Sequence, residues 1–464
     1  MKRHVDLRRG TLSNVWTVSW PVMASLLLYV AQINVDMVWV GRLGADEVAA
    51  VAISGAVWFV VMALIQAVGG GAAPLVGRHT GAGQEAARRA VVRGALGLTL
   101  AGSLVVAAAG ALLTDSVLSQ FSLEPAVRDH GVAYLRVLFY GVPLIYGGRV
   151  AFDIINATGD TRTPLKITAL ATALNLALDP LLIFGWGPVP ALGVTGAAVA
   201  TVAAHGICCV LGLRAVQRQI GLGRRGAGAA EARSILAIGL PACLQALSRP
   251  VTGMLLFGIA AHLGTAVLAG FGIGLRCLSL MFVYLESLGV ATRTLVAQHL
   301  GAGDPRRARE VVRRVLLLGL VLQAGVTLIY QLAAPAMVAL FNARPGVVAA
   351  GTGYLRVVAA AMPLLVPITA CGGAQSGAGH TRPPMAASLL GNWVVKLPLA
   401  YLAVHHLPAE ALSSLGGAAA GLWLAVAASI VAEAVVVVLT YLGGAWARPG
   451  CKPQAAPADP AATD

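Results

Sequence analysis

Two carboxylates and one amide lie within long apolar segments of this sequence. Asp36 is near the end of the apolar run 15–40, and Asn175 and Asp179 stand four residues apart in NLALDPLLIF. If these runs cross a bilayer, an ionised carboxylate inside one costs about 3 kcal/mol and normally faces a cavity or a partner. A spacing of four also places Asn175 and Asp179 on one face of a helix. The pattern is typical of a proton or cation site; the alternative is that both aspartates extend towards the outer interface.

The composition is that of an integral membrane protein. Of 464 residues, 58% are hydrophobic and 11% are charged, whereas soluble proteins have about 25% charged residues. The net charge of +14 comes from basic residues in short loops between apolar runs, which argues against a nucleic-acid-binding domain. The sequence has no histidine cluster, nucleophile–base pair, metal-ligand spacing or P-loop. It therefore predicts neither an enzyme nor an ATP-driven pump, and no cofactor.

The apolar runs predict an all-α protein that crosses the membrane many times, since a spanning helix needs about 20 mostly apolar residues. We predict twelve spans, at residues 15–40, 48–76, 91–113, 130–157, 165–184, 192–215, 234–260, 267–298, 312–340, 351–375, 385–404 and 416–443. Lys and Arg are concentrated in the N-terminal segment and the even-numbered loops. This distribution predicts that both termini are cytoplasmic, in a bacterial-type inner (plasma) membrane.

The two halves of the sequence repeat each other at a shift of 220 residues. The shift carries Gly81-Ala82-Gly83 to Gly301-Ala302-Gly303, Tyr134-Leu135-Arg136 to Tyr354-Leu355-Arg356, and Thr161-Arg162 to Thr381-Arg382. Because six spans return the chain to its starting side, the halves are parallel repeats, related by a pseudo-two-fold axis along the membrane normal. Transporters with this architecture bind substrate between their lobes.

The repeat also predicts the domain organisation. We expect a cytoplasmic N-terminus at 1–14, an N-terminal six-helix lobe at 15–215 and a basic cytoplasmic linker at 216–233. A C-terminal six-helix lobe at 234–445 and a disordered cytoplasmic tail at 446–464 follow, the tail being rich in Pro and Ala. A monomer is the expected state, because the core between the lobes is internal to one chain.

Several motifs in this order resemble the multidrug and toxic compound extrusion (MATE) family. They are WPVMASLLLYVAQINVDMVWVGRLG in the first span, GAGQEAARRA and GAGDPRRARE after the second and eighth, GDTRTP after the fourth, NLALDPLLIFG in the fifth and LGVTGAAVAT opening the sixth. The resemblance extends to about residue 445. It implies a V-shaped pair of six-helix bundles that exports organic cations in exchange for protons or sodium.

The resemblance implies a cation-binding site in the N-terminal lobe, at the positions of Asp36, Asn175 and Asp179, with Thr201 of the sixth span nearby. In a dehydrated pocket, burial and a neighbouring carboxylate both favour the protonated form of a carboxyl group. Protonation would remove the charge that holds a cationic substrate. Sodium, bound by Asp36, Asn175 and Asp179 with the Thr201 oxygen, is the alternative coupling ion, and the sequence does not choose between the two.

The C-terminal half does not duplicate this site. Allowing a three-residue deletion, Asn392 matches Asn175, but Lys396 replaces Asp179. We therefore expect no sodium site in the second lobe. Lys396 either pairs with an N-lobe carboxylate when the outer mouth closes or extends its ammonium group to the interface.

Other intramembrane charges need partners. Arg249 in the seventh span and Glu286 in the eighth lie at comparable depth, which predicts a structural or gating ion pair between them. Arg149 and Asp153, four residues apart, are expected to pair locally.

Polar and aromatic residues within the spans are candidates for a substrate cavity. Glutamines line such cavities or make interhelical hydrogen bonds, and tyrosines can hold an organic cation by cation–π contact or face lipid. The candidates are Tyr29, Gln32, Gln66, Tyr140 and Gln245.

Together these features predict a secondary active efflux transporter, coupled to protons or sodium, that exports organic, mostly cationic, amphipathic compounds by alternating access. Its partners would be small-molecule organic cations and the lipid bilayer, with no nucleic acid. A lipid-linked oligosaccharide flippase of the same superfamily is the alternative. Such flippases tend to have more spans and a more cationic cavity, and Arg249, Arg276 and Lys396 keep this alternative open.

Overall fold

The computed structural model describes residues 10–121, 123–222, 228–406 and 418–447, and these are almost entirely helical. Residues 448–464 of the predicted disordered tail, the first nine residues and part of the basic linker lie outside the described residues. Trp446 and Ala447, at the start of the predicted tail, instead form the end of a short helix in which Trp446 is buried. Within the described residues, only a short antiparallel bridge between Trp186 and Val189 is not helix or connecting loop.

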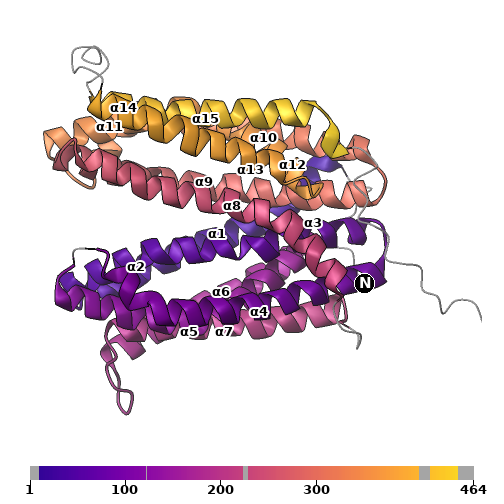
Figure 1. The fold of residues 1–464 in the computed structure, drawn as a ribbon, viewed down its shortest axis with the longest axis horizontal. Helices are drawn as coiled ribbons and strands as arrows, with labels where there is room; N and C mark the ends of the chain where they lie inside the picture. Colours follow the sequence, from indigo (N-terminus) through magenta and orange to yellow (C-terminus); the bar gives the residue numbers. More distant parts are fainter. Residues whose placement is uncertain (1–9, 122, 223–227, 407–417, 448–464) are drawn as a thin grey trace, which may run out of the picture.

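The chain folds into two stacked groups of helices (Figure 1). The N-terminal lobe contains α1 (Thr11–Val40), α2 (Ala45–Leu64), α3 (Gln66–Gly81), α4 (Glu85–Leu118), α5 (Pro125–Ala157), α6 (Arg162–Phe184) and α7 (Val194–Gln219). The C-terminal lobe contains α8 (Ala229–Ala261), α9 (Thr265–Gly301), α10 (Pro305–Ala339), α11 (Pro345–Ala361), η1 (Met362–Leu364), α12 (Leu365–Gly377), α13 (Arg382–Leu389), η2 (Leu390–Lys396), α14 (Leu397–His405), α15 (Ala418–Leu442) and η4 (Ala445–Ala447).

The predicted number of spans is confirmed. Eleven helices or continuous helix pairs of the described chain are long and apolar enough to cross a membrane, and the count reaches twelve when α9, bent by 43°, is included. The continuous spans are α2 with α3, α11 with α12, and α13 with α14. Each lobe therefore contributes six spans, and each has its own core of buried aliphatic and aromatic side chains.

Both ends of the described chain lie at one face of the molecule, which we call the terminal face. Val15 and Val18 near the start of α1 share a buried cluster with Trp446 of η4 and with Leu295 of α9. The start of α1 thus packs into the C-terminal lobe. Its far end packs against α6 of its own lobe, so that α1 connects the two.

The lobes meet tightly at the terminal face through α3, α8 and α9, and α8 crosses from one lobe to the other there (Figure 1). A Cβ atom on Gly81 would lie 2.0 Å from the Gln298 carbonyl oxygen, and one on Gly301 would lie 2.0 Å from the Arg78 carbonyl oxygen. These two contacts are equivalent under the 220-residue shift. Backbones can approach this closely only where a side chain is absent, which explains the repeated Gly81 and Gly301.

Side-chain hydrogen bonds also cross this contact between the lobes, which we call the seam. Gln298 Nε2 of α9 donates to the Ala157 carbonyl oxygen at 2.9 Å, and Arg78 Nη1 of α3 donates to the Ala378 carbonyl oxygen at 3.4 Å. Because both donors end on backbone carbonyls of the opposite lobe, they fix the relative position of the lobes at this face.

We expect Gly81→Val to separate the lobes at the terminal face, because its side chain would overlap the Gln298 backbone. Nitroxide labels at Ala86 and Arg306, both exposed, would report this in a cysteine-free background. The variant should shift the label distances to longer values. Gly97→Val is the matched control, since a Cβ there has no atom within 4 Å. Identical distance distributions in both variants and in the parent would show that the close approach does not hold the seam.

Candidate functional site

The three N-lobe polar residues come together between α1 and α6. Asn175 and Asp179 are fully buried on one face of α6, and Asp36 reaches them from α1. Asn175 Nδ2 donates to Asp179 Oδ1 at 3.4 Å. The carboxyl groups of Asp36 and Asp179 contact each other directly. Neither aspartate therefore extends away to the interface.

This cluster has more acceptors than donors. Asp36 Oδ1, Asn175 Oδ1 and Asp179 Oδ2 are buried, and no hydrogen-bond donor of the described residues reaches any of them. Buried polar atoms in native proteins are nearly always satisfied. Three unsatisfied oxygens in one cluster fit a group that brings positive charge, either a proton shared by the carboxyls or a hard cation such as sodium. Among the described residues, no group of three or more His, Cys, Asp or Glu side chains is arranged to hold a metal ion.

An apolar and aromatic shell surrounds the carboxyl pair. Val40, Ile183 and Ala197 form a small buried cluster, and Trp39 meets Phe184 edge to face with ring centroids 6.2 Å apart. Tyr134 of α5 packs against the same cluster, beside both carboxyl groups. Sequence reasoning did not assign Tyr134 to the site, although it belongs to the repeated Tyr-Leu-Arg triplet.

Two of the predicted residues have other contacts. Gln32 is 6% exposed, and its side-chain oxygen accepts a hydrogen bond from Thr172 Oγ1 of α6 at 3.3 Å, so it joins α1 to α6 rather than lining a cavity. Thr201 is in contact with His205, whose Nδ1 lies 2.8 Å from the Thr201 carbonyl oxygen. A role of the Thr201 side chain at the carboxyl pair stays a prediction.

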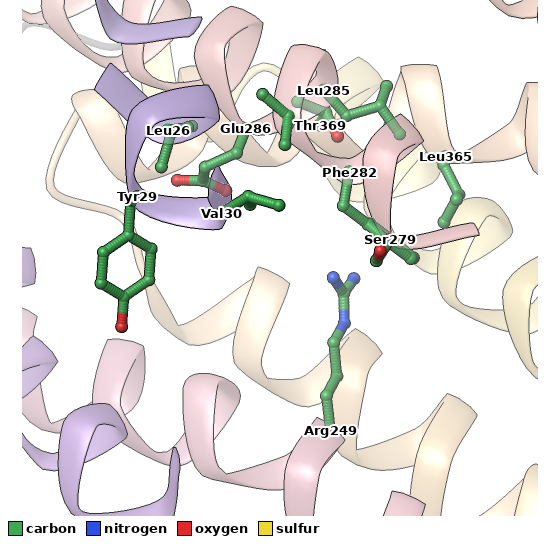
Figure 2. A pocket seen from close by; sticks show the side chains of 11 residues that line it. Leu26, Tyr29, Val30, Arg249, Ser279, Phe282, Leu285, Glu286, Leu365 and Thr369 are labelled. Carbon is green, nitrogen blue, oxygen red and sulfur yellow. The ribbon is translucent and has the colours of Figure 1, made fainter. Parts of the chain in front are cut away.

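A cavity of about 340 Å³ lies between α1 and the C-terminal lobe; we call it the central cavity (Figure 2). Tyr29 is one of its α1 residues, whereas Gln66, Gln245 and Tyr140 are not among its lining residues; Tyr140 is 69% exposed. The lining consists of Leu26, Tyr29 and Val30 of α1, Arg249 of α8, Ser279, Phe282, Val283, Leu285 and Glu286 of α9, and Leu365 and Thr369 of α12.

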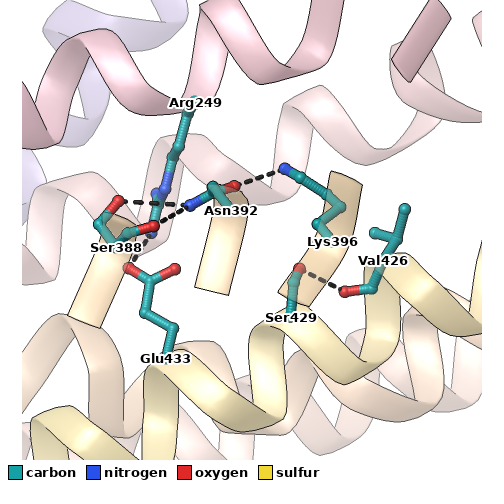
Figure 3. Close-up of polar contacts among 7 residues, drawn as sticks. All are labelled: Arg249, Ser388, Asn392, Lys396, Val426, Ser429 and Glu433. Atoms are coloured by element: carbon teal, nitrogen blue, oxygen red, sulfur yellow. Dashed lines mark hydrogen bonds and ion pairs between the residues drawn. The ribbon is translucent and has the colours of Figure 1, made fainter. Parts of the chain in front are cut away.

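Arg249 and Glu286 both line the central cavity, but they do not form the predicted ion pair. Arg249 Nη2 donates to Glu433 Oε1 of α15 at 3.1 Å (Figure 3), and Arg293 Nη2 donates to Glu286 Oε1 at 2.8 Å. Equal depth in the membrane did not determine which partner each side chain faces. Glu433, which the sequence reasoning overlooked, is 5% exposed and is the acid that Arg249 compensates.

Lys396 is also held within the C-terminal lobe. Its ammonium group donates to Asn392 Oδ1, while Asn392 Nδ2 donates to the Ser388 carbonyl oxygen at 2.8 Å (Figure 3). The predicted contact with an N-lobe carboxylate is not made in this conformation. Asn392 and Lys396 lie on η2, a π-helical stretch, which shifts them relative to an ideal α-helix.

A second pair of charges faces the lobe boundary near the terminal face. Arg149 Nε and Asp153 Oδ1 of α5 lie 3.6 Å apart, as the four-residue spacing predicts. This pair interacts electrostatically with Glu286 and Arg293 of α9. The four residues thus form a charge network of two acids and two bases. This network joins the lobes between the central cavity and the terminal face.

The comparisons with known proteins agree with this architecture. The MatE family model matches residues 21–181 and 241–402, one match in each lobe. The "Probable multidrug resistance protein NorM" of Deinococcus radiodurans is 31% identical over 439 residues, covering 91% of this chain and 93% of that protein. Its namesake in Thermotoga maritima is 26% identical over 434 residues, covering 92% and 91%.

A solved structure has the same fold. It is described as the outward-facing conformation of a multidrug resistance MATE family transporter of the MOP superfamily. It is 22% identical, with a TM-score of 0.85 over 96% of this chain and 97% of that one. The fold, the two family matches and the full-length relatives show that this chain belongs to the MatE family of membrane transporters, which are not enzymes.

Proposed function

We propose that this protein is a secondary active efflux transporter that exports organic, mostly cationic, amphipathic compounds in exchange for protons. The observation that carries the proposal is the buried, acceptor-rich cluster of Asp36, Asn175 and Asp179. The names of the Deinococcus and Thermotoga relatives support multidrug export. We favour protons over sodium because the two carboxyl groups contact each other directly and can share a proton.

Helix α1 can couple this cluster to the substrate. Asp36 and Tyr29 are seven residues apart on α1, which is about 10 Å along a helix, and Tyr29 lines the central cavity. The start of the same helix is packed into the C-terminal lobe. A change in how Asp36 is held against α6 therefore acts on a helix that contacts the cluster, the cavity and the other lobe.

We further propose that the terminal face is cytoplasmic, in a bacterial plasma membrane. The first residues of α4 and α10, both at this face, are rich in arginine: Arg88, Arg89 and Arg93 in α4, and Arg306, Arg307, Arg309, Arg313 and Arg314 in α10. Basic loops remain on the cytoplasmic side. The seam between the lobes would then close the inner side and leave the central cavity accessible from outside. The flippase alternative is not favoured, because each lobe has six spans and the full-length relatives are named for drug resistance.

We expect Asp36→Asn and Asp179→Asn each to reduce transport to the background of vesicles without the protein, because an amide cannot take up the coupling proton. Inverted vesicles with an acidified lumen should take up ethidium when they contain the parent protein. Glu85→Gln, an exposed acid in a surface ion pair with Arg89, is the control and should retain uptake. Undiminished pH-driven uptake in both aspartate variants would refute this coupling site.

We expect Asn175→Ala to retain most of the uptake driven by a pH gradient, because Asn175 supports Asp179 by one hydrogen bond but carries no proton itself. A sodium site would instead lose an oxygen ligand in this variant. The same vesicles should be tested with a pH gradient and then with a sodium gradient. Uptake that follows only the sodium gradient, and that Asn175→Ala abolishes, would replace protons by sodium as the coupling ion.

A further inference from the structure

The start of α10 carries a row of arginines that faces away from the rest of the protein. Arg306, Arg309 and Arg313 are exposed, and their spacing of three and four residues places them on one face of the helix. We call these three residues the α10 stripe. The opposite face of the same turns is buried, because Ala308 and Val312 belong to the cluster that also holds the start of α1.

No acid of the described chain forms an ion pair with the α10 stripe. The two acids at the start of this helix have other partners, since Asp304 lies 3.7 Å from Arg307 and Glu310 lies 3.6 Å from Arg314. The part of the chain that the structure describes thus leaves three guanidinium groups, each with five N–H donors, without an anionic partner.

The N-terminal lobe uses the equivalent arginines differently. The 220-residue shift relates the last two arginines of the stripe to Arg89 and Arg93 of α4, and the first to Ala86. Arg89 Nε donates to the Ile220 carbonyl oxygen at 3.0 Å, and Arg93 Nη1 donates to the Leu222 carbonyl oxygen at 2.6 Å. The α4 arginines therefore hold the chain that follows α7, whereas no carbonyl group of the described residues accepts a hydrogen bond from the α10 stripe.

The face of α10 that carries the stripe continues as an apolar surface. Leu317, Leu320 and Leu328 follow at helical spacing and are all exposed. Because α10 is long and apolar enough to span a membrane, these leucines are suited to contact acyl chains. Arg313 precedes Leu317 by four residues, which is about 6 Å along a helix. The stripe thus begins where the acyl-chain surface ends, at the depth of lipid headgroups.

An aromatic pair lies at the same depth. Tyr441 of α15 interacts electrostatically with Arg309, and its ring stacks on Trp446 of η4 with centroids 5.0 Å apart. Tyr and Trp are enriched where a membrane protein passes from hydrocarbon to water. This pair supports, independently of the arginines, the position of the stripe at the membrane surface.

We propose that the α10 stripe binds the phosphate of an anionic phospholipid, such as phosphatidylglycerol, in the cytoplasmic leaflet. The proposal rests on the proposed cytoplasmic position of the terminal face. Guanidinium groups form paired, charge-assisted hydrogen bonds with phosphate oxygens, and basic residues at a membrane surface attract anionic lipids. The apolar surface beside the stripe favours a lipid over a free phosphate ion, which has no acyl chain to place there.

Binding of lipids to the purified, delipidated protein in detergent tests the proposal. Native mass spectrometry would be used to titrate phosphatidylglycerol and, as the zwitterionic comparison, phosphatidylethanolamine with the same acyl chains. We expect the parent protein to bind one phosphatidylglycerol about 100-fold more tightly, from three arginines that each contribute about fivefold.

The informative variant combines Arg306→Gln, Arg309→Gln and Arg313→Gln. All three side chains are exposed, so glutamine there leaves the packing of α10 intact. We expect this variant to bind phosphatidylglycerol no more tightly than phosphatidylethanolamine, because the groups that distinguish the two headgroups are removed.

The matched control combines Arg162→Gln, Arg214→Gln and Arg218→Gln. These arginines are exposed and belong to the start of α6 and the end of α7, which meet at the terminal face through the hydrogen bond from Gln219 Nε2 to Asp160 Oδ2 at 2.7 Å. The control removes the same charge from the same face but leaves α10 unchanged, and it should retain the preference for phosphatidylglycerol.

The proposal is overturned if the parent protein binds both lipids equally, or if the control variant loses phosphatidylglycerol as far as the stripe variant does. Displacement of the lipid by inorganic phosphate at the same concentration would also overturn it. Labelling of Arg306→Cys by a membrane-impermeant maleimide in intact cells, in a cysteine-free background, would overturn the assigned leaflet. These readouts need no ion gradient, so failure of the lipid site differs from failure of the proposed export function, which is seen as loss of gradient-driven ethidium uptake.

Discussion

The dominant constraint on this molecule is that an ionised group inside an apolar environment requires a partner. Three arginines between the helices satisfy it: Arg249 is bound to Glu433, Arg293 to Glu286, and Arg149 lies beside Asp153. The cluster of Asp36, Asn175 and Asp179 does not, because it contains oxygens that no described donor reaches. This cluster is therefore suited to accept a positive ion from outside.

The sequence predicted the architecture because the signals for it are local or periodic. The lengths of the apolar runs predicted twelve spans, and the 220-residue shift divided them into two lobes. The four-residue spacing placed Asn175 and Asp179 on one face of α6. The contact of Asp36 with Asp179 followed from equal depth in neighbouring spans. Each of these arguments needs the position along a helix and little else.

The partners of the C-lobe charges could not be predicted in this way. Depth alone suggested Glu286 for Arg249, but the choice depends on the direction in which each helix face points, and Glu433 lies 184 residues further along the chain. The sequence also gave no signal for the π-helical stretch η2, which shifts Asn392 and Lys396 relative to an ideal α-helix. For Gln32, where cavity lining and an interhelical hydrogen bond were both possible, the helix face meets Thr172 of α6 and makes the hydrogen bond.

The repeat is symmetric where the lobes must close and asymmetric where they bind. Gly81 and Gly301 make equivalent backbone contacts across the seam, so the repeat symmetry is kept where the two lobes touch. At the positions that face the interior, Asp179 in the first lobe corresponds to Lys396 in the second. At these equivalent positions the first lobe thus has an acid and the second a base. Two acidic lobes would compete for the same cation, whereas the lysine at the second position restricts the proposed coupling site to the first lobe.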